Sequence, residues 1–237
     1  MVDHFMILLN HLNLNKIFVV GHDWGMKPAS RIALYQPERT MGLVLLSAAY
    51  MPPGLFDLDQ AIANSAAYCG YDSLGYWKFF DSDDAASIIE NNLESFIDLV
   101  YAINTTLFKT DFAPTGKMRQ WLTNKHRTAR ASYMTENDYN IVRQYLTKEM
   151  QPKLNWYRST IANVDWEDEK NIEPTIQRPI LFMRGKQVDI CRETSFAKQS
   201  SFTPNIEIID FDTGHWLMEE QPETIHQAIE EWIKKIS

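Results

Sequence analysis

The sequence predicts an α/β fold, in which a core with a mostly parallel β-sheet carries a helical insertion. Three observations indicate this fold class. A strand–helix–strand pattern lies near the start of the chain, residues 51–168 contain few strand-like runs, and strand-like runs return after residue 179. A chain of 237 residues, 45% of them hydrophobic, is long enough to bury such a core.

The first elements along the chain form the strand–helix–strand unit. Residues 2–12 space apolar side chains at helical intervals, and residues 17–20 form a continuous apolar run typical of a strand buried on both faces. A helix is expected from about residue 24 to residue 36, where Pro37 ends it. Residues 41–48 then predict a second buried strand, which completes a βαβ unit of a parallel sheet.

The later elements differ between the middle and the end of the chain. Helix-like stretches cover residues 84–103 and 135–150. Residues 179–185 and 205–211 are strand-like, and residues 224–236 place apolar side chains on one stripe of a closing helix. This change of pattern predicts two parts: an α/β core and a helical lid inserted into it.

The boundaries of these parts follow from the points at which the pattern changes. We expect residues 1–54 and 169–237 to form the core and residues 55–168 to form the lid. No internal repeat or low-complexity segment interrupts either part.

Composition and charge exclude several kinds of partner. The net charge is −8 and no long basic run occurs, which argues against nucleic acid and anionic membranes. No apolar run is long enough to span a bilayer, and the first residues lack the basic leader of a signal peptide. Cys69 and Cys191 are far apart and lack metal-ligand spacing, so we expect two reduced thiols in a cytoplasmic protein.

The five residues Gly21-His22-Asp23-Trp24-Gly25 stand between the first expected strand and its helix. A strand, the pattern Gly-x-nucleophile-x-Gly and a helix form the nucleophile elbow of the α/β-hydrolases. The apex here is Asp23, whose carboxylate would attack an electrophilic carbon and form an ester that an activated water must cleave. The backbone N–H of Trp24 would contribute to an oxyanion hole.

A second interpretation of Asp23 is purely structural. Aspartate is a favoured N-cap residue and stabilises a helix by roughly 0.5–2 kcal/mol. The flanking glycines and the preceding buried strand favour the nucleophile over the cap.

A base and an acid are expected after the nucleophile, in the chain order nucleophile, acid, histidine. His215 follows the last expected strand and is the candidate base, whereas the other histidines lie in the elbow or in helix-like stretches. The candidate acid is Asp189, on the loop after residues 179–185, where a buried carboxylate would fix the imidazole tautomer. Glu193 on the same loop is the alternative, and a solvated carboxylate remains a competing interpretation for both.

Several longer motifs resemble one family. The stretches VVGHDWG, YQPERTMGLVLLSAAYMPPG, GYDSLGYWKFF, LNWYR and GHWLMEEQPE together are similar to the soluble epoxide hydrolases of the α/β-hydrolase superfamily, the fungal branch in particular. The similarity covers essentially the whole chain. GHDWG alone also occurs in haloalkane dehalogenases, and LNWYR makes the resemblance to epoxide hydrolases more specific.

The resemblance implies an activity and its residues. A small hydrophobic epoxide and water would give a vicinal diol through an ester on Asp23, with His215 activating water and Asp189 as its charge partner. No metal or organic cofactor is implied, and the family suggests a role in detoxification. Two lid tyrosines, Tyr76 and Tyr157, would donate hydrogen bonds to the epoxide oxygen.

The lid assignments also leave alternatives open. Tyr71 lies close to Tyr76 in the sequence and is the alternative to it. By the same resemblance, three aromatic side chains would line an apolar substrate pocket, although each is equally well explained as core packing. These are Trp24, Phe79 and Trp156.

This sequence departs from the family pattern at its start. The family's His-Gly-x-Pro loop, which supplies half of the oxyanion hole, does not occur, and the chain begins at the helix before the elbow strand. The earlier core strands are therefore expected to be absent, as in a fragment or a shortened sheet. The elbow strand would then have an exposed edge, which a homo-oligomer would cover.

Two other functions remain open at this point. A haloalkane dehalogenase-type hydrolase uses the same nucleophile, base and acid, but it needs halide-binding donors in place of lid tyrosines. A weak or inactive hydrolase-like binding protein is the third hypothesis, because of the expected missing strands.

Overall fold

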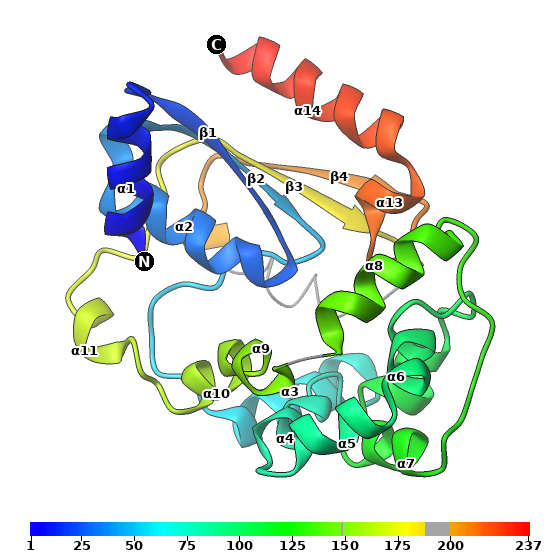
Figure 1. Ribbon diagram of the computed structural model, residues 1–237. Helices are drawn as coiled ribbons and strands as arrows, with labels where there is room; N and C mark the ends of the chain where they lie inside the picture. Colours follow the sequence, from blue (N-terminus) through cyan, green and yellow to red (C-terminus); the bar gives the residue numbers. More distant parts are fainter. Residues whose placement is uncertain (148, 188–199) are drawn as a thin grey trace. The chain divides into compact units, whose positions relative to one another are not determined.

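The computed structural model describes residues 1–147, 149–187 and 200–237 (Figure 1). The chain divides into two compact units. Met1–Gly54 and Glu169–Ser237 form one of them, called here the core unit. Leu55–Asp168 form the other, called here the helical unit.

The described part of the core unit is built on a four-stranded sheet in which all neighbouring strands are parallel (Figure 1). The sheet order is the chain order β1-β2-β3-β4. Its strands are β1 (Ile17–His22), β2 (Thr40–Leu46), β3 (Ile180–Gly185) and β4 (Ile206–Phe211). The α/β class and the four strands predicted from the sequence are confirmed, with boundaries shifted by one or two residues.

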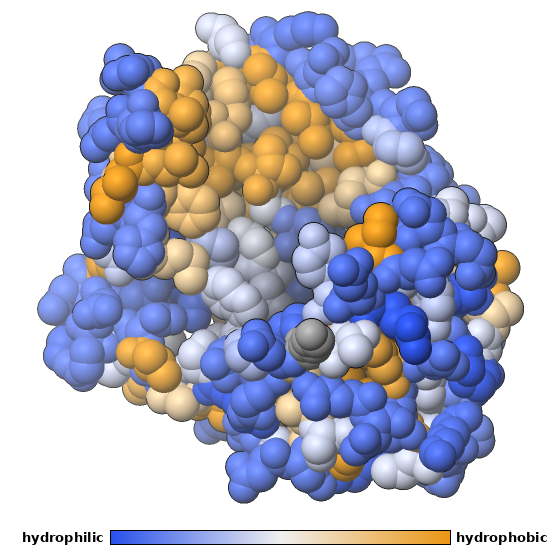
Figure 2. All heavy atoms as spheres, viewed as in Figure 1, coloured by the Kyte–Doolittle hydropathy of each residue, from blue (hydrophilic) through white to orange (hydrophobic). Residues whose placement is uncertain are grey.

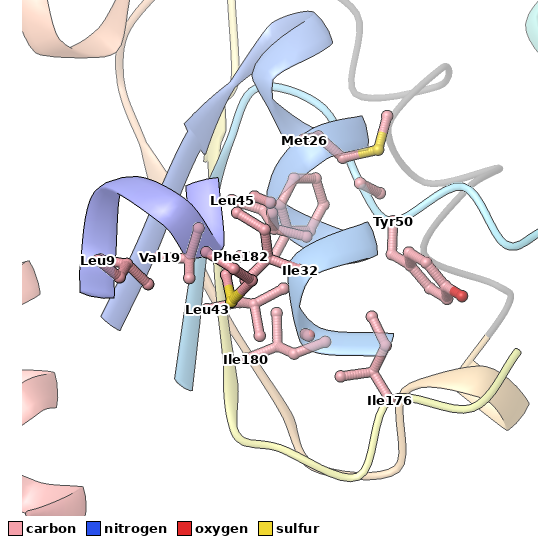
Figure 3. Close-up of a cluster of buried hydrophobic side chains, with 14 residues drawn as sticks. Leu9, Val19, Met26, Ile32, Leu43, Leu45, Tyr50, Ile176, Ile180 and Phe182 are labelled. Carbon is pink, nitrogen blue, oxygen red and sulfur yellow. The ribbon is translucent and has the colours of Figure 1, made fainter. Parts of the chain in front are cut away.

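Helices cover both faces of this sheet. Helices α1 (Val2–His11) and α2 (Met26–Tyr35) pack on one face, and α14 (Pro222–Ile236) packs on the other (Figure 1). The first face buries side chains such as Leu43 and Phe182 against α2 (Figure 3), and the second buries Trp232 of α14. Because both faces are covered, β2 and β3 are almost fully buried, which explains their continuous apolar runs.

The outer edge of β1 lacks a strand neighbour among the described residues, since β1 pairs only with β2 there. In β1, Val20 is 52% exposed, and α1 also exposes apolar side chains. Figure 2 shows a broad apolar surface over this part of the core unit. Among the described residues, β1 is thus an edge strand of the sheet.

The helical unit contains mostly short helices. These are α3 (Leu58–Cys69), α4 (Tyr76–Asp81), α5 (Ala85–Asn91), α6 (Leu93–Val100), α7 (Lys117–Thr123), α8 (Glu136–Leu146), α9 (Met150–Lys153), α10 (Asn155–Ile161) and the start of α11 (Trp166–Glu169). The stretch expected to be helical over residues 84–103 holds two helices, because the backbone leaves the helical region at Asn92 (φ −132°).

The two ends of the helical unit are joined to each other by one asparagine. Asn163 accepts a hydrogen bond from the backbone N–H of Phe56 through Oδ1 and donates one to the carbonyl oxygen of Phe56 through Nδ2, at 2.6 and 3.0 Å. Near the first end, Asp57 caps α3 by accepting from the backbone N–H of Gln60. The insertion is thus closed on itself by local contacts.

One expectation about the cysteines is wrong. Cys69, at the end of α3, is disulfide-bonded, whereas the sequence suggested reduced thiols. The other cysteine, Cys191, lies outside the described residues. The argument for a cytoplasmic protein therefore loses its support from cysteine chemistry. Within the described residues, every helix is too short or too polar to cross a bilayer.

Candidate active site

The turn at the elbow depends on one glycine more than on the other. Strand β1 ends at His22, a 3₁₀ turn covers Asp23–Gly25, and α2 begins at Met26. A β-carbon on Gly21 would lie 2.4 Å from the carbonyl oxygen of Gly25, so the turn excludes any side chain there. A β-carbon on Gly25 would meet nothing within 4 Å, so the turn leaves room for a side chain at this second glycine.

The conformation of Asp23 argues against a capping role. The N-cap residue of α2 is Gly25, two residues further along the chain. Asp23 itself has φ 49°, in the left-handed region that non-glycine residues adopt infrequently. Such a backbone conformation is typical of functional sites, where the surrounding structure holds a residue under strain.

The structure brings Asp23 and His215 together. The Nε2 atom of His215 lies 3.5 Å from Oδ1 of Asp23, and the two side chains are 23% and 28% exposed. His215 follows β4 and precedes α13 (Leu217–Glu220), whereas Asp23 follows β1. The carboxyl ends of parallel strands lie at the same end of a sheet. Two residues 192 positions apart can therefore become neighbours there.

Two further residues hold His215 and were not selected from the sequence. Ser47 Oγ donates a hydrogen bond to the backbone carbonyl oxygen of His215 at 2.6 Å, and His22 Nε2 lies 3.0 Å from the same oxygen. Burial lowers the pKa of His22 below 6.5, against the opposing effects of this backbone contact and of Asp23. One signal was present in the sequence: Ser47 directly follows a buried strand, where site residues of parallel sheets gather.

The candidate acids cannot be placed beside His215, because Asp189 and Glu193 both lie outside the described residues. Among the described residues, Glu220 Oε2 accepts a hydrogen bond from the backbone N–H of Gly214 at 2.9 Å. This carboxylate fixes the loop immediately before His215. The choice between the two candidate acids stays a prediction.

In the helical unit, the two candidate tyrosines are neighbours. Tyr76 opens α4 and Tyr157 lies in α10, with ring centroids 5.8 Å apart and ring planes 75° apart. Both rings also contact Trp77 and Phe80 in an edge-to-face aromatic cluster. The ring of the alternative, Tyr71, lies beneath Lys109 Nζ, 5.8 Å from the centroid.

The three aromatic residues proposed to line a pocket have different surroundings. Phe79 is buried at 4% exposure, and the Arg119 guanidinium lies 4.9 Å from its ring centroid. This packing favours the core interpretation for Phe79. Trp24 and Trp156 are half-buried, each in its own unit.

The parallel sheet, the strand–turn–helix elbow and the histidine loop after the last strand define an α/β-hydrolase fold with an aspartate at the elbow apex. No family model matches the chain. Sequence and structure comparisons nevertheless find similar proteins, and these are epoxide hydrolases.

Two curated relatives show the similarity in sequence. The bifunctional epoxide hydrolase 2 of Sus scrofa is 23% identical over 234 residues, which cover 95% of this chain and 40% of the relative. Epoxide hydrolase 3 of Siraitia grosvenorii is 25% identical over 247 residues, covering 96% of this chain and 72% of the relative. The chain thus spans about 40% of the length of the bifunctional relative. The fungal branch suggested by the motifs stays a prediction.

Solved structures support the same fold. An epoxide hydrolase from an endophytic Streptomyces superposes with a TM-score of 0.79 at 24% identity, covering 98% of this chain and 72% of its own. An epoxide hydrolase from Vigna radiata gives a TM-score of 0.76 at 20% identity, with 99% and 74% covered. These likenesses establish the α/β-hydrolase fold of the chain.

Proposed function

We propose that this chain is an epoxide hydrolase, which adds water to a small hydrophobic epoxide to give a vicinal diol. The observation that carries the proposal is the pair of Asp23 and His215, with 3.5 Å between Oδ1 and Nε2 at the elbow. A carboxylate at the apex favours attack on an electrophilic carbon, and the similar proteins are named epoxide hydrolases.

The proposed reaction has two steps. A carboxylate oxygen of Asp23 attacks one epoxide carbon, the C–O bond of the ring opens, and an alkyl ester of Asp23 forms. His215 then takes a proton from water, whose oxygen attacks the ester carbonyl carbon. The backbone N–H of Trp24 stabilises the oxyanion that develops, and Asp189, or alternatively Glu193, stabilises the imidazolium.

Two tyrosines are proposed to assist the first step. Ring opening places negative charge on the epoxide oxygen, and a neutral tyrosine hydroxyl can donate a hydrogen bond or a proton to it. The adjacency of the Tyr76 and Tyr157 rings supports their assignment as a pair. Trp24 and Trp156 remain candidates for contacts with the apolar part of the substrate, with Phe79 the weakest of the three.

An isotope experiment tests the aspartyl-ester mechanism directly. The protein is incubated in ¹⁸O-water with an aryl epoxide in substoichiometric amount, so that each molecule turns over at most once. The proposal expects diol that carries ordinary oxygen, because the added oxygen comes from Asp23, and heavy oxygen in the peptide that contains Asp23. Heavy oxygen in the first-turnover diol would instead show direct attack by water.

The control is Asp23→Asn, which keeps the shape of the side chain and removes the carboxylate. Diol formation undiminished in this variant would refute the nucleophile assignment. Release of halide from a chloroalkane without turnover of any epoxide would favour the dehalogenase reaction. A folded protein that forms neither diol nor covalent adduct would favour a binding function.

A further inference from the structure

The backbone carbonyl oxygen of His215 has two side-chain neighbours that come from two different strand ends. Ser47 follows β2 and donates through Oγ at 2.6 Å. His22 ends β1 and approaches with Nε2 at 3.0 Å. Because a carbonyl oxygen only accepts hydrogen bonds, the His22 Nε2 must carry the hydrogen and donate it. The two side chains therefore hold one point of the histidine loop.

Ser47 has a backbone conformation that its side chain does not favour. Its φ is 60°, in the left-handed region, and the residue is only 2% exposed. Glycine would adopt this conformation without the steric cost that a β-carbon brings. The backbone N–H of Ser47 donates to Met183 of β3, so the strained position is fixed by the sheet. What serine adds over glycine here is the hydroxyl bound to His215.

His22 holds the loop by its ring as well as by its hydrogen bond. Its ring centroid lies 4.7 Å from that of His215 and 5.2 Å from that of Trp216. Burial lowers the pKa of His22, so the ring is neutral at pH 7 and places its one N–H on the nitrogen that faces the carbonyl.

The loop before His215 is fixed by other contacts. The backbone N–H of Gly214 donates to Glu220 at 2.9 Å. A β-carbon on Gly185 would lie 2.1 Å from the carbonyl oxygen of Gly214, so β3 and the loop are in close backbone contact. Ser47 and His22 extend this anchoring to the backbone of the candidate base itself.

We propose that Ser47 and His22 are positioning residues, which fix the His215 backbone so that its imidazole is held beside the Asp23 carboxylate. This inference rests on the proposed function. Both residues lie in the core unit together with Asp23 and His215. Their effect is exerted through the position of His215, and neither needs to touch the substrate.

The rates of the two reaction steps distinguish a positioning role for Ser47 and His22 from a general role in stability. Ester formation uses the Asp23 carboxylate, and no proton transfer to His215 is required. Ester hydrolysis requires His215 to accept a proton from water while the water oxygen bonds to the ester carbon; the ester C–O bond then breaks and the proton passes to the leaving alkoxide. A displaced His215 therefore slows the second step and leaves the first almost unchanged.

The decisive variant is Ser47→Gly, measured by rapid-quench kinetics with intact-mass detection of the ester. It removes the hydroxyl and relieves the left-handed strain, which offsets part of the cost of the lost hydrogen bond, so the variant is expected to fold. We expect ester hydrolysis to slow about 10- to 100-fold, because displacements near 1 Å have effects of this size. Ester formation should stay within about threefold, and the ester should accumulate. Wild-type hydrolysis, or equal slowing of both steps, would overturn the proposal.

Two substitutions of His22 provide the matched pair. His22→Gln keeps an N–H donor at a reach similar to Nε2, whereas His22→Phe keeps a flat ring and loses the donor. The proposal expects slow ester hydrolysis in the phenylalanine variant and substantial rescue in the glutamine variant. Equal hydrolysis rates in the two would show that the donor is irrelevant.

An amide hydrogen-exchange measurement keeps the inference separate from the proposed activity. In Ser47→Gly and His22→Phe, the amides of residues 213–217 are expected to exchange faster than in the wild type, while those of β2 and β3 are unchanged. Hydrogen exchange can be measured even if the wild-type protein forms neither ester nor diol. That failure would refute the proposed function and leave the positioning role to be decided by the exchange rates. Unchanged exchange at residues 213–217 in both variants would overturn the positioning role.

Discussion

The guanidinium group of Arg31 holds the carboxylate of Glu169 by two hydrogen bonds, Nε to Oε1 at 2.6 Å and Nη2 to Oε2 at 2.8 Å. Both side chains are buried, with 8% and 9% exposure. Nη1 of Arg31 also donates to the carbonyl oxygen of Met51 at 2.8 Å. Met51 lies three residues before Gly54, the last residue of the first segment of the core unit. Glu169 is the first residue of the second segment of this unit. One arginine of α2 thus binds both connecting segments.

Removing one partner of this ion pair should destabilise the core unit. In Glu169→Gln the Arg31 charge stays buried without its counter-ion, and breaking such a pair costs about 3–5 kcal/mol. The free energy of unfolding from urea titration is the measurement. The matched control is Glu207→Gln, which breaks the exposed contact with Lys235 and should change stability by less than about 1 kcal/mol. Equal effects in the two variants would contradict the burial argument.

The two glycines of the elbow should differ in their tolerance of a methyl group. Gly21→Ala forces a β-carbon to 2.4 Å from the carbonyl oxygen of Gly25, and overpacking of this kind costs about 1–3 kcal/mol or more. Gly25→Ala meets open space at φ −59°, so stability should change by less than about 1 kcal/mol. Chemical denaturation of both variants checks this, and a Gly21→Ala protein as stable as the wild type would contradict the observed turn.

Removal of the candidate base should trap the proposed intermediate. In His215→Gln, Asp23 still attacks the epoxide but water is no longer activated, and loss of a general base typically reduces the rate about 10²–10⁴-fold. Intact-mass spectrometry should then show one substrate mass added to the protein. The control is His215→Gln combined with Asp23→Asn, in which no adduct should form. An adduct in this double variant would place the attack on another residue.

The two neighbouring tyrosines should affect ring opening. Tyr76→Phe and Tyr157→Phe each remove one hydroxyl while keeping the aromatic cluster, so ester formation should slow by about 10²-fold or more. Single-turnover kinetics measure this step. Tyr71→Phe is the control and should form the ester at nearly the wild-type rate. A larger effect from Tyr71→Phe than from Tyr76→Phe would reverse the assignment of the first tyrosine.

Stability should fall with pH below 6.5, in part through His22. Burial lowers the pKa of His22 in the folded protein, so the unfolded chain binds this proton first as the pH decreases from 6.5. The free energy of unfolding therefore decreases over the interval between 6.5 and the lower folded-state pKa. His22→Gln should flatten this slope in urea titrations between pH 7 and pH 5, where about 1.4 kcal/mol corresponds to one pKa unit. His226→Gln, on an exposed face of α14, should stay closer to the wild-type slope.

The order of the core elements could be predicted from the sequence because its signals are local. The apolar run at residues 43–46 indicated a strand covered on both faces, and these residues are buried in β2. The run at residues 17–20 also forms a strand, but Val20 is 52% exposed, so the expectation that this strand is buried on both faces is wrong. Asp23 could be selected because the residues around it define the elbow within one turn. His215 could be selected because its loop follows the last strand.

The contacts around His215 depend on segments far apart in the chain, and no local pattern encodes them. The hydroxyl of Ser47 reaches a carbonyl 168 positions away, and the ring of His22 reaches the same atom from another strand. The unequal roles of Gly21 and Gly25 were also hidden, since the sequence shows two glycines but not which one faces a backbone oxygen. Similarly, the sequence around Arg31 shows an ordinary helix and does not indicate that its guanidinium binds Glu169.

The sequence by itself determined the α/β class, the elbow and the identity of its apex residue, because these depend on residue types within a few positions of one another. Only the tertiary structure decided that Asp23 lies 3.5 Å from His215 and that Ser47 and His22 hold the histidine loop. The physical reason is the parallel sheet, in which the carboxyl ends of all strands lie at the same end of the sheet, whatever their separation in the chain.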